Sequence, residues 1–194
     1  IGLAAALFVF LMKQCHPERF PDRLAALAFG LYILDFFLMP FAYEAIDMEK
    51  LPFHVCTATC VACFLSHHWE PLKPWRSHLA RLAFVSNLVY LIYPAGVMWH
   101  EIHPLSYRAY QTLLFHSLMV VYGLLVLVYE NEAKTHPFRH VLGVTVCMAV
   151  WALIGNYTYN ASVEGYDYFF NWFFVVRDPF HVISESISPF VMPF

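Results

Sequence analysis

The stretch YRAYQTLLFHSLMVVYGLLVLVY, residues 107–129, decides the fold class. After Arg108 it contains no Asp, Glu, Lys or Arg, and it supplies the roughly 20 apolar residues that a helix needs to cross ~30 Å of hydrocarbon. Its apolar residues follow one another without the alternation that is typical of a barrel strand. The stretch therefore predicts a membrane-spanning α-helix.

The same argument from length and hydropathy predicts further helices along the chain. Apolar runs occupy residues 1–13, 23–43, 51–66, 79–99 and 141–157, and a seventh, truncated span could begin near residue 187. Because apolar runs also open and close the sequence, we expect both chain ends to lie within spans. Residues 1–194 should then form one all-α domain, a polytopic transmembrane helical bundle with about six spans.

The composition agrees with a membrane protein. Hydrophobic residues make up 60% of the chain and charged residues 13%, whereas soluble domains carry roughly 25% charged residues. The net charge of -3 comes without a basic stripe or a nucleic-acid-binding motif, which argues against a nucleic-acid partner. The expected partners are membrane lipids, with other membrane subunits as an open alternative. The sequence identifies no cofactor.

The distribution of Lys and Arg predicts the orientation, because short cytoplasmic loops carry the excess of these residues. The first, third and fifth loops are basic, and the second, fourth and last connections are poor in basic residues. We therefore expect a multi-pass protein of the cell membrane with its amino end outside. The basic loops hold Lys13, Arg19, Arg23, Lys73, Arg76, Arg81, Lys134 and Arg139, against Lys50, Arg108 and Arg177 elsewhere.

Candidate site residues are the polar groups inside the apolar runs, since such groups are costly in hydrocarbon and usually face a cavity or a partner. His116 should lie ~13 Å below the outer end of its helix, near mid-membrane. His54 opens the 51–66 run two positions before Cys56, and Gly123 allows another helix to approach the His116 helix closely. Either these groups line one pocket in the outer half of the bilayer, or they join helices by hydrogen bonds. The candidate pocket residues are Asp35, Asn87, Tyr90, Thr112, Asn156 and Tyr157.

Cys56, Cys60 and Cys63 form one stripe by their helical spacing. A thiol there could serve as a nucleophile activated by an imidazole, or the stripe could be packing by small side chains. His54 lies about 200° around the helix from Cys56, so a catalytic pair would have to form across helices. The pairs His67–His68 and His100–His103 should lie at opposite membrane faces, and we predict no metal site from them.

Several of these strings resemble the YwaF-type integral membrane proteins of bacteria. The likeness runs from about Leu51 to Tyr159 and rests on LPFHVC at 51–56, Tyr93-Pro94, Phe115-His116 and NYTY at 156–159. It implies a membrane protein of six or seven helices without an established activity.

A more distant likeness is to the animal transmembrane acyltransferases that remodel ether phospholipids. It implies catalytic roles for His54 and His116, and Asp178-Pro179-Phe180 fits a similar stretch there. The position of that family's nucleophilic Cys is occupied by Phe53. The resemblance therefore suggests a lipid acyl-transferring or acyl-hydrolysing enzyme, with His116 as general base and Cys56 or water as nucleophile. The alternative is a non-catalytic membrane subunit or a small-molecule permease.

Overall fold

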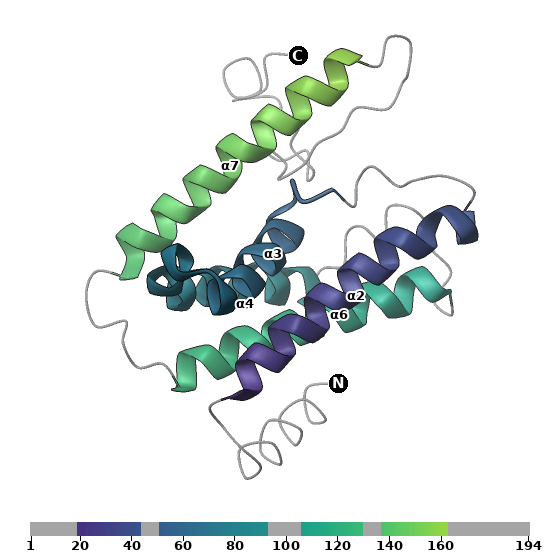
Figure 1. Ribbon diagram of the computed structural model, residues 1–194. Coiled ribbons are helices and arrows are strands. Elements are labelled where there is room, and N and C mark those ends of the chain that lie inside the picture. Colours follow the sequence, from purple (N-terminus) through teal and green to yellow (C-terminus); the bar gives the residue numbers. More distant parts are fainter. Residues whose placement is uncertain (1–18, 44–50, 93–105, 130–136, 163–194) are drawn as a thin grey trace.

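The computed structural model describes residues 19–43, 51–92, 106–129 and 137–162, and all regular structure in these ranges is helical (Figure 1). The all-α class is therefore confirmed for the described part of the chain. Its elements are α2 (Phe20–Tyr43), α3 (Val55–His68), the 3-10 helix η3 (Glu70–Trp75), α4 (Arg76–Ile92), α6 (Tyr107–Tyr129) and α7 (Pro137–Ser162).

The helix α6 has the bounds that its sequence predicts, whereas α3 begins later than its apolar run. The run opens with Pro52, and the chain turns there, with the Phe53 amide donating to the Leu51 carbonyl at 2.7 Å. His54 is extended, with φ -72 and ψ 148, and occupies the N-cap position of the helix. The 14 residues of α3 then rise only ~21 Å, which is short of the ~30 Å of a bilayer core.

In the described residues, two helices are long and apolar enough to cross a membrane, Tyr107–Tyr129 and Arg139–Thr158. The described residues therefore do not support the expectation of about six spans. The helix α3 is too short, and α2 carries Asp22 and Arg23 in its first turn and Asp35 in its second half. The predicted runs at 1–13 and from 187, and the end of 79–99, lie outside the described residues.

The helices α4 and α6 pack antiparallel and share the most extensive contact in the described fold. Gly123 sits against Ala80 and Phe84, while His116 meets Asn87 further along α4. A Cβ at Gly123 would lie 2.6 Å from the Ala80 carbonyl oxygen, which is closer than packed atoms come. The close approach expected at Gly123 is therefore confirmed, and it sets the register in which His116 meets α4.

The other helices arrange around this pair, with α2 beside α6 and α7 on the far side of α3 and α4 (Figure 1). At one end, Asp22 at the start of α2 pairs with His68 at the end of α3. At the same end, His78 at the start of α4 stacks on His140 at the start of α7. We call this end the basic end, and Arg108 lies at the opposite end with the start of α6. The described basic residues of the basic end are Arg19, Arg23, Lys73, Arg76, Arg81 and Arg139.

Large apolar side chains cover much of the outer surface, and polar side chains are buried inside. On α7, the exposed residues Leu142, Val146, Val150 and Ile154 recur at every fourth position and form one face. The interior combines apolar residues such as Met119 with several polar groups. The buried polar side chains are Asp35, Thr57, Thr59, Ser66, Ser77, His78, Asn87, His116 and Asn156.

Candidate functional site

His116 lies near the middle of α6 and is 4% exposed. Its Nδ1 is 2.6 Å from Oδ1 of Asn87 on α4, and Asn87 is fully buried. The Tyr90 ring, one turn further along α4, stacks on the imidazole with centroids 3.7 Å apart and planes 15° from parallel. Three of the predicted site residues are thus brought into direct contact across the α4–α6 interface.

The Asn87 amide fixes which imidazole nitrogen carries the proton. Its Nδ2 donates to the Ala83 carbonyl at 2.7 Å and to Oγ of Ser86 at 3.3 Å, and a carbonyl oxygen can only accept. Oδ1 must therefore point to His116, whose Nδ1–H donates to it. In the neutral ring, Nε2 then carries the lone pair, so this nitrogen can accept a hydrogen bond or a proton.

Aromatic rings continue from this site toward α2. Phe115 meets the His116 ring edge to face, with centroids 5.3 Å apart, and Tyr32 packs against Phe115 at 6.4 Å. Asp35 lies one turn beyond Tyr32 on α2 and is 2% exposed. These contacts place the imidazole among side chains of α2, α4 and α6 that exclude bulk water.

The thiols of α3 have two different environments. Cys56 is half-buried and lies close enough to Tyr90 and Tyr32 to interact with both electrostatically. Cys60 and Cys63 are fully buried in the main apolar cluster. Of the three, Cys56 is the thiol near Tyr90, which stacks on His116, whereas Cys60 and Cys63 lie inside the apolar cluster.

The remaining predicted residues lie on α6, just before α3 and on α7. Thr112, one turn before His116, is half-buried and its hydroxyl contacts the Gln111 side-chain carbonyl at 3.3 Å. His54 is half-buried, and its carbonyl accepts the Ala58 amide at 2.8 Å and the Thr57 hydroxyl at 3.1 Å. Asn156 is fully buried on α7, and Tyr157 beside it is 55% exposed.

Just before the start of α3, the chain forms an aromatic stack with α7 beside Gly155. Phe53 lies on Trp151 with ring centroids 5.0 Å apart, and Trp151 Nε1 donates to the Pro52 carbonyl at 2.8 Å. A Cβ at Gly155 would come within 2.5 Å of the Phe53 ring. Phe53 therefore packs against α7, where Gly155 leaves the space for it.

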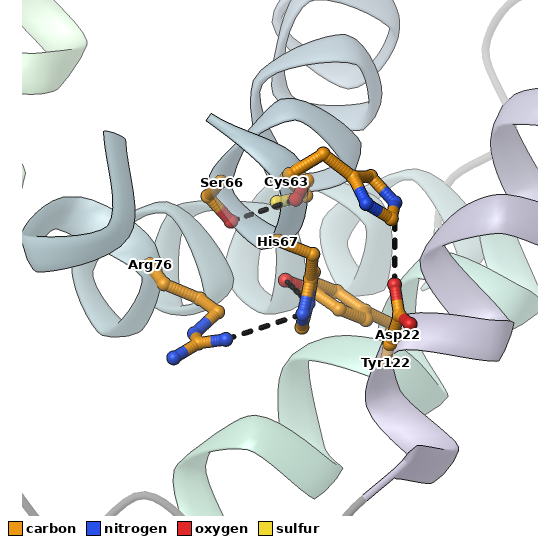
Figure 2. A network of polar contacts seen from close by, with 7 residues as sticks. Asp22, Cys63, Ser66, His67, Arg76 and Tyr122 are labelled. Atoms are coloured by element: carbon orange, nitrogen blue, oxygen red, sulfur yellow. Dashed lines mark hydrogen bonds and ion pairs between the residues drawn. The ribbon is translucent and has the colours of Figure 1, made fainter. Parts of the chain in front are cut away.

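A second polar network, which the sequence reasoning missed, lies at the basic end (Figure 2). His67 Nε2 is 3.1 Å from the Tyr122 hydroxyl, and its Nδ1 is 3.2 Å from Nη1 of Arg76. Arginine can only donate, so Nδ1 accepts and the neutral ring donates from Nε2 to Tyr122. The Tyr122 hydroxyl also hydrogen-bonds Cys63, one turn before His67 on α3.

Burial and the neighbouring Arg76 lower the pKa of His67 to about 4, which keeps the ring neutral. On the surface beside it, His68 Nε2 lies 3.3 Å from Asp22 Oδ1 and joins α3 to α2. The four-residue spacing of Cys63 and His67 was the sequence signal for this network. Its partners on α4 and α6 are distant in the sequence, so the spacing alone did not reveal them.

In the described part of the chain, no three His, Cys, Asp or Glu side chains gather as a metal site requires. The His67 nitrogens are engaged by Tyr122 and Arg76. His100 and His103 lie outside the described residues.

No protein-family model, curated protein or solved structure matches this chain.

Proposed function

We propose that the chain is a multi-pass protein of the cell membrane, oriented with its basic end in the cytoplasm. The outward apolar faces support this, because exposed stripes such as that on α7 suit lipid better than water. The separation of charge supports the orientation, since six of seven described Lys and Arg residues lie at the basic end and the seventh is Arg108. In this arrangement His116 lies deep in the bilayer.

The function that the geometry supports best is a lipid acyl-transferring or acyl-hydrolysing activity with His116 as general base. The observation that carries the proposal is the bond from Nδ1–H to Asn87, which makes Nε2 the proton acceptor of the neutral ring. Cys56, near Tyr90, or a water molecule would be the nucleophile. The likeness to the YwaF-type proteins and to the membrane acyltransferases belongs to the same proposal.

In such a reaction, Nε2 takes the proton from the thiol or water as the sulfur or oxygen attacks the carbonyl carbon of a lipid ester. The tetrahedral intermediate expels the alcohol, which recovers the proton from Nε2. The acyl group is left as a thioester on Cys56 or leaves as the free fatty acid. Asn87 keeps Nδ1 protonated throughout, so the ring exchanges its proton at Nε2.

A specific observation favours the second candidate, a non-catalytic membrane subunit or a small-molecule permease. His116 is 4% exposed and its ring face is covered by Tyr90, an arrangement that also suits an imidazole used to join helices or to bind a ligand. In that case Cys56 is dispensable, because binding needs the imidazole but no thiol.

An assay of acyl transfer distinguishes the two candidate functions. The protein is incubated in vesicles with phospholipid that carries a labelled acyl chain, and labelled protein and labelled fatty acid are measured. A thioester route predicts a labelled protein that is lost in both Cys56→Ser and His116→Gln. A water route predicts labelled fatty acid that persists in Cys56→Ala and disappears in His116→Gln. Ser117→Ala, at the next position of α6, is the matched control and should behave as the parent.

The absence of both products from the parent would overturn the catalytic proposal. If His116→Gln then also lowers the binding of the labelled lipid, the binding candidate is supported. Unchanged products in His116→Gln would remove His116 from the chemistry altogether.

A further inference from the structure

The turn between α3 and α4 exposes two tryptophans at the basic end. Trp69 precedes η3 and is 54% exposed, and Trp75 ends it and is 39% exposed. Pro71 and Pro74 shape this short helix, which has no buried residue. Tryptophan is enriched where a protein passes between hydrocarbon and water, because its ring is apolar and its N–H is polar.

The second tryptophan is held in place by two histidines. The Trp75 ring meets His78 of α4 and His140 of α7 edge to face, with centroids 6.1 Å and 5.8 Å apart. The two imidazoles stack on one another at 4.7 Å. Trp75 therefore packs against the first turns of both α4 and α7.

The turn carries one basic side chain, and a second one lies beside His78. Lys73 lies between the two tryptophans in the sequence and is 42% exposed, and Arg81 places Nη1 3.5 Å from Nδ1 of His78. Burial, His140 and Arg81 all lower the pKa of His78, so the imidazole adds little charge of its own. Glu70 pairs with Lys73 and is the acidic residue of this turn.

We propose that the turn Trp69–Trp75, with Arg81, is a binding surface for the headgroups of anionic membrane lipids. The two rings lie at the depth of the glycerol backbone, and Lys73 and Arg81 contact the negatively charged phosphates. This inference rests on the membrane location proposed above and is independent of the chemistry at His116. Glu70 weakens the attraction of this surface for anionic headgroups, because it neutralises part of the Lys73 charge.

The test measures tryptophan quenching in vesicles whose phosphatidylglycerol or phosphatidylcholine carries brominated acyl chains. Trp99, Trp151 and Trp172 are replaced by Phe, which leaves Trp69 and Trp75 as the reporters. At low salt, the relative association constant should favour phosphatidylglycerol by at least about fivefold, the effect expected of one basic side chain near the surface. Lys73→Gln with Arg81→Gln should reduce this preference toward one, and Glu70→Gln should raise it.

Arg108→Gln is the matched control, since it removes one positive charge at the opposite end of the bundle and should leave the preference unchanged. Equal quenching by the two lipids in the parent, or a preference that survives loss of Lys73 and Arg81, would overturn the proposal. So would the absence of quenching by both lipids. Extraction of the protein from membranes by alkaline carbonate would instead disprove the membrane location itself.

Discussion

At the scale of single residues, Asn87 performs two tasks with one amide. Its nitrogen donates a hydrogen bond to the Ala83 carbonyl within α4, and its oxygen accepts a hydrogen bond from Nδ1–H of His116 on α6. Both groups are buried, so neither can exchange its partner for water without opening the helix pair. The side chain is therefore both a link between helices and the determinant of the imidazole tautomer.

Asn87→Leu removes this acceptor and should destabilise the protein by about 1–3 kcal/mol, the usual cost of depriving a buried polar group of its partner. If His116 is a base, the lipid reaction should fall by at least about tenfold as well, because the ring loses its fixed tautomer. Thermal unfolding in detergent and the labelled-lipid assay measure the two effects. Ser86→Ala, which removes the weaker 3.3 Å contact of the same amide, should change stability by less than about 0.5 kcal/mol.

His67 predicts how stability depends on pH. Its pKa is about 4 in the folded protein and near 6.5 in an unfolded chain. Between these values the unfolded state binds a proton that the folded state does not, so stability is complete above pH 6.5 and decreases as the pH falls toward 4. The lowered pKa of His78 acts in the same direction.

The melting temperature should thus decrease from pH 7 to pH 4.5, and the decrease should be smaller in His67→Gln. Glutamine keeps a donor and an acceptor for Tyr122 and Arg76 but does not titrate. An identical pH dependence in this variant would show that the ionisation of His67 does not contribute.

At the scale of elements, the packing of α4 on α6 depends on one position that has no side chain. A Cβ at Gly123 meets the Ala80 backbone oxygen at 2.6 Å, and backbone cannot move aside as a side chain can. Gly123→Ala should force the helices apart and cost about 1–3 kcal/mol. It should also weaken the contact between His116 and Asn87, two turns away.

Gly143→Ala is the matched control on α7, since nothing lies within 4 Å of its new Cβ. Alanine favours a helix over glycine, so this variant should be neutral or more stable by up to about 1 kcal/mol. Melting temperatures of the two variants measured side by side provide the check. Equal effects would contradict the role assigned to the α4–α6 contact.

How far the sequence predicted these elements depended on whether the deciding forces were local. The bounds of α6 were predictable because an apolar run without a breaker fixes them. The start of α3 was not, since the turn at Pro52 competes with the hydropathy of the run. His116, Asn87 and Tyr90 were each identified as polar groups in apolar helices. Their contact follows from the register that Gly123 sets, which no local pattern encodes.

At the scale of the whole molecule, the proposed orientation places the basic end in the cytoplasm and can be tested by labelling. A cysteine at Glu70, which is 81% exposed, should resist an impermeant thiol reagent on intact cells and react after the cells are opened. A cysteine at Tyr107, at the opposite end and 47% exposed, should react in intact cells. The parent without added cysteine sets the background. The reverse pattern would invert the proposed orientation.

In the proposed membrane location, the outward apolar faces and inward polar groups of the bundle also govern which amino acids natural variants can accept. At Val146 or Val150, different apolar side chains pack against lipid equally well. These positions can therefore be substituted by other hydrophobic residues at little cost. At Asn87 or His116, a hydrophobic replacement removes a hydrogen-bond partner that nothing else supplies. Among variants of this chain, constancy should therefore mark the polar interior, and the greatest variation should follow the apolar surface.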